Sequence, residues 1–280
     1  MLVDLINVER RECIKILSES DLMNSFPEED NQYLFHYTAY PSALNILLSQ
    51  QLRLGSLEKM NDPLEFEDHH GQPLMYQGER SEEEYEKTVR DYEGSVSEKE
   101  RSVRFVSFSM DRYPCCNNFS KGCARSRIWA QYADNHKGVC LVSDRTNLIK
   151  AFESSFKNDV CRAYCKEIDY TNNLQPLGDT LSLPCKSLLT EDKIEFLFQK
   201  CEDFRDEQEF RLLLINTILR DSKEMVSFSI ADSICGVITG VRFSTDNKPA
   251  LKRAVESCNP AIKFFTMSWH YGMPGIWKDP

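Results

Sequence analysis

The chain has 280 residues, of which 41% are hydrophobic and 28% are charged. This is the composition of a folded globular protein, and it excludes a collagen-like, low-complexity or intrinsically disordered chain. The 44 acidic residues outnumber the 34 basic ones and give a net charge of −10, which argues against non-specific binding of DNA or anionic lipid. A local basic patch would still allow nucleic acid as a partner.

No apolar run approaches the roughly 18 residues that a membrane-spanning helix needs. Charged residues between Asp4 and Glu12 interrupt any apolar stretch of a signal peptide. We therefore expect a cytoplasmic protein without a membrane partner. The 11 cysteines are expected to be reduced core residues, because their spacing does not match the paired motifs of a zinc site, and no metal is expected.

The first 30 residues have the pattern of a helix followed by a loop. Apolar residues from Leu2 to Leu17 recur at helical intervals, and Ser25-Phe26-Pro27 ends the pattern. We expect an N-terminal helical extension over residues 1–30, which could contact a partner protein.

The rest of the chain is expected to form a single domain over residues 31–272, with a charged helical insertion at about 71–103 and a C-terminal tail at 273–280. Strands are predicted at 34–38, 52–54, 105–109, 139–142, 207–215, 234–243 and 262–265, and helices at 41–48, 81–92, 128–133, 194–201 and 251–255. Thr38 is expected to cap the helix that begins near Pro41. Because helices and strands do not alternate strictly, the pattern favours the α+β class.

Three predicted strands carry polar side chains on one face. Since side chains alternate along a strand, residues two apart share a face. The three polar faces carry His36 and Thr38, then Ser107 and Ser109, and finally Glu207, Glu209 and Arg211. They suggest a shared cleft, although an exposed charged ladder and a histidine satisfied in the core would give the same pattern.

Six short motifs follow one another in an order that resembles a bacterial domain-of-unknown-function family, over roughly residues 33–270. The motifs are His36-Tyr37-Thr38, Asn61-Asp62-Pro63-Leu64-Glu65, Val106-Ser107-Phe108-Ser109, Trp129-Ala130-Gln131-Tyr132-Ala133, His136-Lys137-Gly138-Val139-Cys140 and Glu207-Gln208-Glu209-Phe210-Arg211. The family looks like a remote relative of the ADP-ribosyltransferases, which hold NAD in a split β-sandwich. The resemblance implies a split β-sandwich-like core with peripheral helices, and NAD as the substrate.

The resemblance also assigns roles to residues of this chain. His36 matches the first-strand histidine that binds the adenosine ribose, with Thr38 beside it. The Ser107-Phe108-Ser109 segment resembles the middle-strand motif that supports the catalytic glutamate and packs near nicotinamide. Glu207 and Glu209 resemble a Glu-x-Glu motif whose second glutamate is catalytic.

In that assignment Glu209 stabilises the oxocarbenium charge that develops as the nicotinamide–ribose bond breaks. Glu207 orients or deprotonates the acceptor, and Arg211 holds the carboxylates or reaches the pyrophosphate. The aromatic residue that stacks on nicotinamide is left open between Tyr37, Phe108 and Tyr132. Alternation along the strand points Tyr37 away from His36.

The predicted function is therefore an NAD-dependent ADP-ribosyltransferase-like enzyme in a bacterial toxin or phage-defence setting, with a protein, nucleic acid or nucleotide as acceptor. A plain NAD glycohydrolase and a non-catalytic interaction or ligand-sensing module are the alternatives. The predicted catalytic residues are Glu209, Glu207 and His36, and the predicted NAD-binding residues are His36, Tyr37, Thr38, Ser107, Phe108, Ser109, Tyr132 and Arg211.

Two further groups of residues have a simpler interpretation. Lys121, Arg125 and Arg127 form a small basic cluster that could contact a phosphate, but a solvated helix face is favoured. Trp129 and Tyr132 lie at helical spacing, which is more typical of a core stripe than of a ligand platform.

Overall fold

The structure, a computed structural model, describes residues 32–57, 101–113, 117–172, 194–219, 221 and 223–278, together with residues 83, 86–87, 90 and 94. The strands are β1 (Tyr33–Thr38), β2 (Gln51–Ser56), β3 (Val103–Ser109), β4 (Val139–Asp144), β5 (Cys161–Glu167), β6 (Asp169–Tyr170), β7 (Gln199–Lys200), β8 (Glu209–Asn216), β9 (Val226–Ser229), β10 (Ile234–Thr239), β11 (Lys263–His270) and β12 (Met273–Lys278). The α-helices are α3 (Tyr40–Ser49), α6 (Ser126–Tyr132), α7 (Arg145–Ser155) and α9 (Lys248–Cys258). Short 3-10 helices are η3 (Asn118–Ser120), η4 (Gly122–Ala124), η7 (Glu195–Phe198), η8 (Glu202–Glu207) and η9 (Thr245–Asn247).

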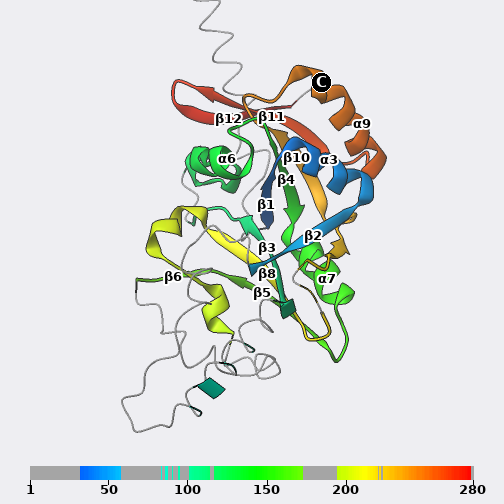
Figure 1. Ribbon diagram of the computed structural model, residues 1–280. Coiled ribbons are helices and arrows are strands. Elements are labelled where there is room, and N and C mark those ends of the chain that lie inside the picture. Colours follow the sequence, from blue (N-terminus) through cyan, green and yellow to red (C-terminus); the bar gives the residue numbers. More distant parts are fainter. Residues whose placement is uncertain are drawn as a thin grey trace, which may run out of the picture. The chain divides into compact units, whose positions relative to one another are not determined.

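This is a mixed α+β structure with a large, mostly antiparallel sheet, which confirms the predicted class (Figure 1). The chain divides into two compact units. The first unit comprises Met1–Leu52, Phe108–Leu148 and Ser229–Pro280, and the second comprises Arg53–Ser107 and Ile149–Phe228.

The sheet of the first unit has the strand order β12-β11-β10-β4-β1-β3. All neighbours pair antiparallel except β10 and β11, which are parallel. Phe35 and Tyr37 of β1 pack on one face with Trp129 of α6 in a buried apolar cluster. The helices α3 and α9 contact each other and bury Leu47 and Leu251 (Figure 1). The first-unit fold thus gives β1 a core face and an opposite face that carries His36.

The second unit is built around β8, which pairs with β3 on one side and with β5 on the other. Every residue from Glu209 to Ile215 is buried, as expected for a central strand with both faces covered. An apolar cluster around Leu213, Ile215 and Phe198 forms its core. The short strands β6 and β7 pair in parallel as a separate two-stranded sheet.

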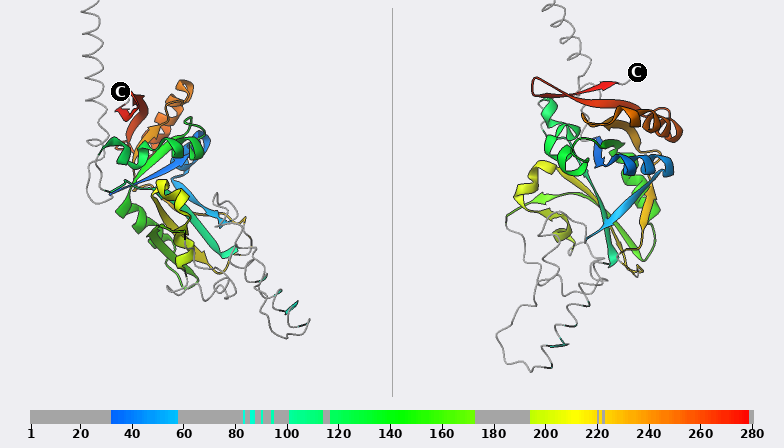
Figure 2. Two further views of the ribbon diagram at one scale, coloured as in Figure 1. Left: turned by 90° about the vertical axis from the view of Figure 1, so that its left-hand side faces the viewer. Right: turned by 45° about the horizontal axis from the view of Figure 1, so that its top comes forward.

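Most predicted elements of the first unit are confirmed, with corrections at their ends. Ala39 occupies the N-cap position of α3 and no side chain makes a capping hydrogen bond there, so the expected cap by Thr38 is wrong. The strand predicted at 234–243 ends at Thr239, because the chain turns at Gly240, whose carbonyl accepts from the amide of Phe243 at 3.0 Å. Residues 273–278, expected within a tail, form β12 and pair with β11 as a hairpin (Figure 2).

One predicted element of the second unit differs more. Residues 194–201 do not form an α-helix: η7 is followed directly by β7. The predicted extension at 1–30, the Asn61–Glu65 motif and most of the predicted helix at 81–92 lie outside the described residues. No helix within the described residues has the length and apolar character needed to cross a membrane.

Candidate functional site

The two predicted glutamates lie together in the second unit, but not through strand alternation. Glu207 is the last residue of η8, and Glu209 is the first residue of β8. Gln208 between them adopts a left-handed conformation with φ 44° and ψ 55°. The prediction that Glu207 belongs to the strand is therefore wrong, because the chain turns at Gln208 before β8 begins.

The glutamates and Arg211 do not form an exposed ladder. Glu207 is 6% exposed, Glu209 3% and Arg211 1%. A buried charge is tolerated only when it is paired and hydrogen-bonded, so each must have close partners.

One carboxylate oxygen of Glu209 is held by two hydrogen bonds. Ser107 of β3 donates through Oγ to Oε1 at 2.5 Å, and Arg211 Nε donates to the same oxygen at 2.8 Å. Arg211 also donates through Nη1 to the carbonyl of Leu197 at 2.7 Å, and its guanidinium lies 5.1 Å from the ring centre of Phe105. Arg211 therefore holds a carboxylate, one of its two predicted roles.

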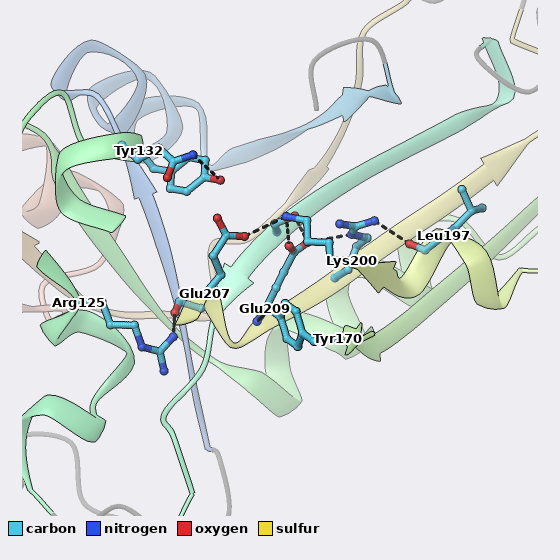
Figure 3. Close-up of polar contacts among 11 residues, drawn as sticks. Arg125, Tyr132, Tyr170, Leu197, Lys200, Glu207 and Glu209 are labelled. Carbon is cyan, nitrogen blue, oxygen red and sulfur yellow. Dashed lines mark hydrogen bonds and ion pairs between the residues drawn. The ribbon is translucent and has the colours of Figure 1, made fainter. Parts of the chain in front are cut away.

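Lys200 joins the two glutamates (Figure 3). Its Nζ lies 2.9 Å from Oε2 of Glu207 and 2.7 Å from Oε2 of Glu209, and the residue is 6% exposed. The ring centre of Phe204 lies 5.3 Å from the same nitrogen. No sequence motif indicates Lys200, which follows the apolar Phe196–Phe198 run after one intervening residue, Gln199.

Tyr170 of β6 contacts the backbone of Glu209. Its hydroxyl oxygen accepts a hydrogen bond from the amide of Glu209 at 2.8 Å (Figure 3). Burial raises the pKa of Tyr170 well above its ordinary value, which keeps the phenol protonated. Ser107, Tyr170, Lys200, Glu207, Glu209 and Arg211 are called the Glu209 cluster below.

The Glu209 cluster contains two carboxylates and two cations, which balance in formal charge. Burial alone would raise the pKa of Glu209, but the charges of Arg211 and Lys200 outweigh it and lower the pKa to about 2. Glu209 is therefore ionised at neutral pH. The cluster supplies a permanently charged, oriented carboxylate.

The remaining predicted residues lie in the first unit. His36 is half-buried, and its ring centre lies 5.5 Å from that of Phe108. Thr38 is half-buried on the same face of β1. Tyr132, also half-buried, accepts a hydrogen bond from Gln131 Nε2 at 3.3 Å (Figure 3).

Tyr37 is used by the core of the first unit. It is 8% exposed, its hydroxyl donates to the carbonyl of Gly122 at 2.6 Å, and its ring packs edge-on against Trp129 with ring centres 5.1 Å apart. Burial raises the pKa of Tyr37 well above the ordinary value. The core prediction for Trp129 is confirmed, since it is fully buried.

The basic cluster is not a solvated face as a whole. Lys121 is fully buried and pairs with Asp111 at 2.9 Å. Arg125 is half-buried and donates to Ser109 Oγ and to the carbonyl of Met110. Arg127 is exposed, so it alone fits the favoured interpretation.

No group of three or more His, Cys, Asp and Glu side chains is arranged to hold a metal ion among the residues that the structure describes. Comparisons with curated proteins and with solved structures gave no match. The family whose description is "Protein of unknown function (DUF2971)" matches residues 128–212, a range that begins in α6 and ends in β8. This part of the chain, which contains Glu207, Glu209 and Arg211, thus resembles a domain-of-unknown-function family.

Proposed function

We propose that the protein is an NAD-consuming, ADP-ribosyltransferase-like enzyme whose catalytic carboxylate is Glu209. The hydrogen bond from Ser107 Oγ to Oε1 of Glu209 carries the proposal. The resemblance implies that a serine of the middle strand supports the catalytic glutamate, and these two residues are 102 positions apart in the sequence. A split β-sandwich-like core remains part of the proposal.

The proposed reaction breaks the bond between nicotinamide and C1 of its ribose, and nicotinamide leaves with the bonding electron pair. Positive charge develops on the ribose, and an ionised carboxylate nearby stabilises it. Glu209 supplies this charge, because its lowered pKa of about 2 keeps it ionised at neutral pH. The acceptor then bonds to C1, and Glu207 takes the proton that the acceptor loses.

The other residues have supporting roles in the proposal. Arg211 positions Glu209, since its Nε is already engaged with Oε1 at 2.8 Å. His36 and Thr38 bind the ribose of the adenosine half. Phe108, beside His36, and Tyr132 are candidates for contact with nicotinamide, while the buried Tyr37 contributes to packing.

A non-catalytic module is the second candidate, and one observation favours it. Glu209 is only 3% exposed and is paired with two cations, which is also how a purely structural carboxylate is held. Such a module would bind no NAD, so millimolar NAD would leave its melting temperature unchanged.

The deciding experiment is nicotinamide release from NAD by the purified full chain, with and without cell lysate as a source of acceptor. Glu209→Gln should abolish release and His36→Ala should weaken it. Glu153→Gln is the matched control, because Glu153 is an exposed glutamate of α7 in the same unit as Glu209. Release without lysate and without a labelled acceptor indicates a glycohydrolase, and no release under either condition refutes the proposal.

A further inference from the structure

We propose that Lys200 is a positioning residue of this site, whose ammonium group holds Glu207 and Glu209 together as one ionised pair. The inference rests on the proposed function and assigns to it a residue that no sequence motif indicated.

The geometry is that of a bridge rather than of two separate ion pairs. One nitrogen, Lys200 Nζ, lies 2.9 Å from Glu207 and 2.7 Å from Glu209, in both cases from Oε2. All three side chains are no more than 7% exposed, so water screens these contacts weakly. Removing the bridge would leave two buried negative charges facing each other.

The two oxygens of Glu209 are held in different ways. Oε1 accepts hydrogen bonds from Ser107 and Arg211, whereas Oε2 accepts none from the described residues and has Lys200 as an ion-pair neighbour. The contact with Lys200 is close but not aligned as a hydrogen bond. Lys200 thus supplies the positive charge nearest to Oε2, while Ser107 and Arg211 fix the orientation of the carboxylate through Oε1.

Elements on several sides bring charged or titratable groups to Glu209. The structure places Tyr170 of β6, Lys200 of β7, Glu207 of η8 and Arg211 of β8 around it. Of these, Lys200 contacts both carboxylates. The loss of Lys200 would change the cluster from formally neutral to −1, and a buried pair of like charges then favours uptake of a proton.

The position of Lys200 is supported by its neighbours. The strand β7 is held against β6, with Lys200 opposite Tyr170 in register, and the ring of Phe204 lies 5.3 Å from the ammonium nitrogen. Tyr170 also binds the amide of Glu209. The same two-stranded element therefore places the ammonium group and anchors the backbone of the carboxylate that it neutralises.

The test compares Lys200→Met, Lys200→Arg and the double variant Lys200→Met/Glu207→Gln, which removes one charge of each sign. Lys166→Met is the matched control, since Lys166 also pairs with a glutamate and lies 5.6 Å from a phenyl ring, but its side chain is 40% exposed. The first readout is the titration of the Glu209 carboxyl carbon by NMR, assigned with Glu209→Gln. The second readout is the pH profile of nicotinamide release.

Lys200→Met should raise the pKa of Glu209 by about one unit or more, and the acidic limb of the activity profile should move to higher pH with it. In Lys200→Arg and in the double variant the pKa of Glu209 should return most of the way to the wild-type value. Lys166→Met should leave this pKa unchanged. If Lys200→Met does not fold, the comparison is made between Lys200→Met/Glu207→Gln and Glu207→Gln. The pKa of Glu209 should be higher in the double variant, because only the single variant keeps the ammonium group.

Each readout can fail separately. If the pKa of Glu209 is unchanged in Lys200→Met, the proposed role of Lys200 is overturned. It is also overturned if Lys200→Met releases nicotinamide faster at every pH, because Lys200 would then block the site. If the wild-type protein releases no nicotinamide, the proposed function fails, and a moved titration would identify Lys200 as a structural counter-ion instead of a positioning residue.

Discussion

Ser107 Oγ donates to Oε1 of Glu209 at 2.5 Å. Both residues belong to the second unit, and the bond joins β3 to the first residue of β8. The acceptor is an ionised carboxylate, and Glu209 is only 3% exposed. Hydrogen bonds to charged groups are the stronger class, and their loss inside a protein is not compensated by water. This contact therefore couples the stability of the second unit to the orientation of the proposed catalytic group.

Replacing Ser107 by alanine should destabilise the protein by about 1.5–3 kcal/mol, because Oε1 loses one of its two donors. In the proposed enzyme the same variant should reduce nicotinamide release about tenfold, since the carboxylate is less well oriented. Urea unfolding and the release assay measure the two effects. The control is Ser155→Ala, at an exposed position of α7, and an equal loss in both variants would contradict the importance of the Ser107 contact.

The lowered pKa of Glu209 predicts how stability depends on pH. Its folded-state pKa of about 2 lies below the ordinary value of 4.5, so the ionised carboxylate stabilises the folded state above about pH 4.5. This contribution, on the order of 3 kcal/mol, should disappear as the pH falls from about 4.5 to about 2.

Urea unfolding across this pH range isolates the contribution of Glu209. The free energy of unfolding of the wild-type protein should fall more steeply toward acid than that of Glu209→Gln, which cannot ionise. Glu153→Gln should follow the wild-type curve, because Glu153 is exposed. Parallel curves for the wild type and Glu209→Gln would show that the folded protein does not favour the ionised form.

Tyr170→Phe should remove the acceptor of the Glu209 amide and leave a buried backbone donor without a partner. The expected cost is about 1–3 kcal/mol, and hydrogen exchange at the amide of Glu209 should become faster. The stacking of Arg205 on the ring, at 5.7 Å, should survive, because phenylalanine keeps the ring. Tyr271→Phe, at a site 88% exposed, tests for any general effect of losing a phenol, and matching costs would exclude the backbone contact as the cause.

Much of the first unit could be predicted from the sequence, because its elements are long and periodic. β1, α3 and β4 were expected within one or two residues of their observed ends, and apolar residues such as Phe35, Leu47 and Val142 are buried. Leu48 of α3 was expected on the buried face with Leu47, but it is 61% exposed. α7 and β12 were not expected. The strand β12 contains a proline and a glycine at Pro274 and Gly275, which are unusual in strands and hide the pattern.

The Glu209 cluster was partly predictable for the same reason. Ser107, Glu209 and Arg211 lie on true strands, where the period of two places polar side chains on one face. Lys200 and Tyr170 belong to two-residue strands, which are too short to show any period. Their contacts arise from tertiary pairing between β6 and β7, which no local pattern encodes.

The turn after α6 requires a glycine at position 138, because the backbone is closely packed there. Asp134, Asn135 and His136 all have positive φ, and Gly138 then passes close to two carbonyl groups before β4 begins. A Cβ atom at Gly138 would lie 2.3 Å from the oxygen of Thr38 and 2.8 Å from that of Ala133. Backbone atoms cannot move aside as a flexible side chain can, so the clash would strain both β1 and the turn.

Gly138→Ala should therefore destabilise the protein by about 3 kcal/mol or more, measured by urea unfolding. Gly55→Ala is the matched control, because its nearest contact would be the carbonyl oxygen of Phe105 at an ordinary 3.6 Å. In that strand alanine should be neutral or slightly stabilising, since it reduces the conformational freedom of the unfolded chain. If Gly138→Ala proved as stable as Gly55→Ala, the close approach of β1, the turn and β4 would be wrong, and with it the register that places His36 opposite Leu141.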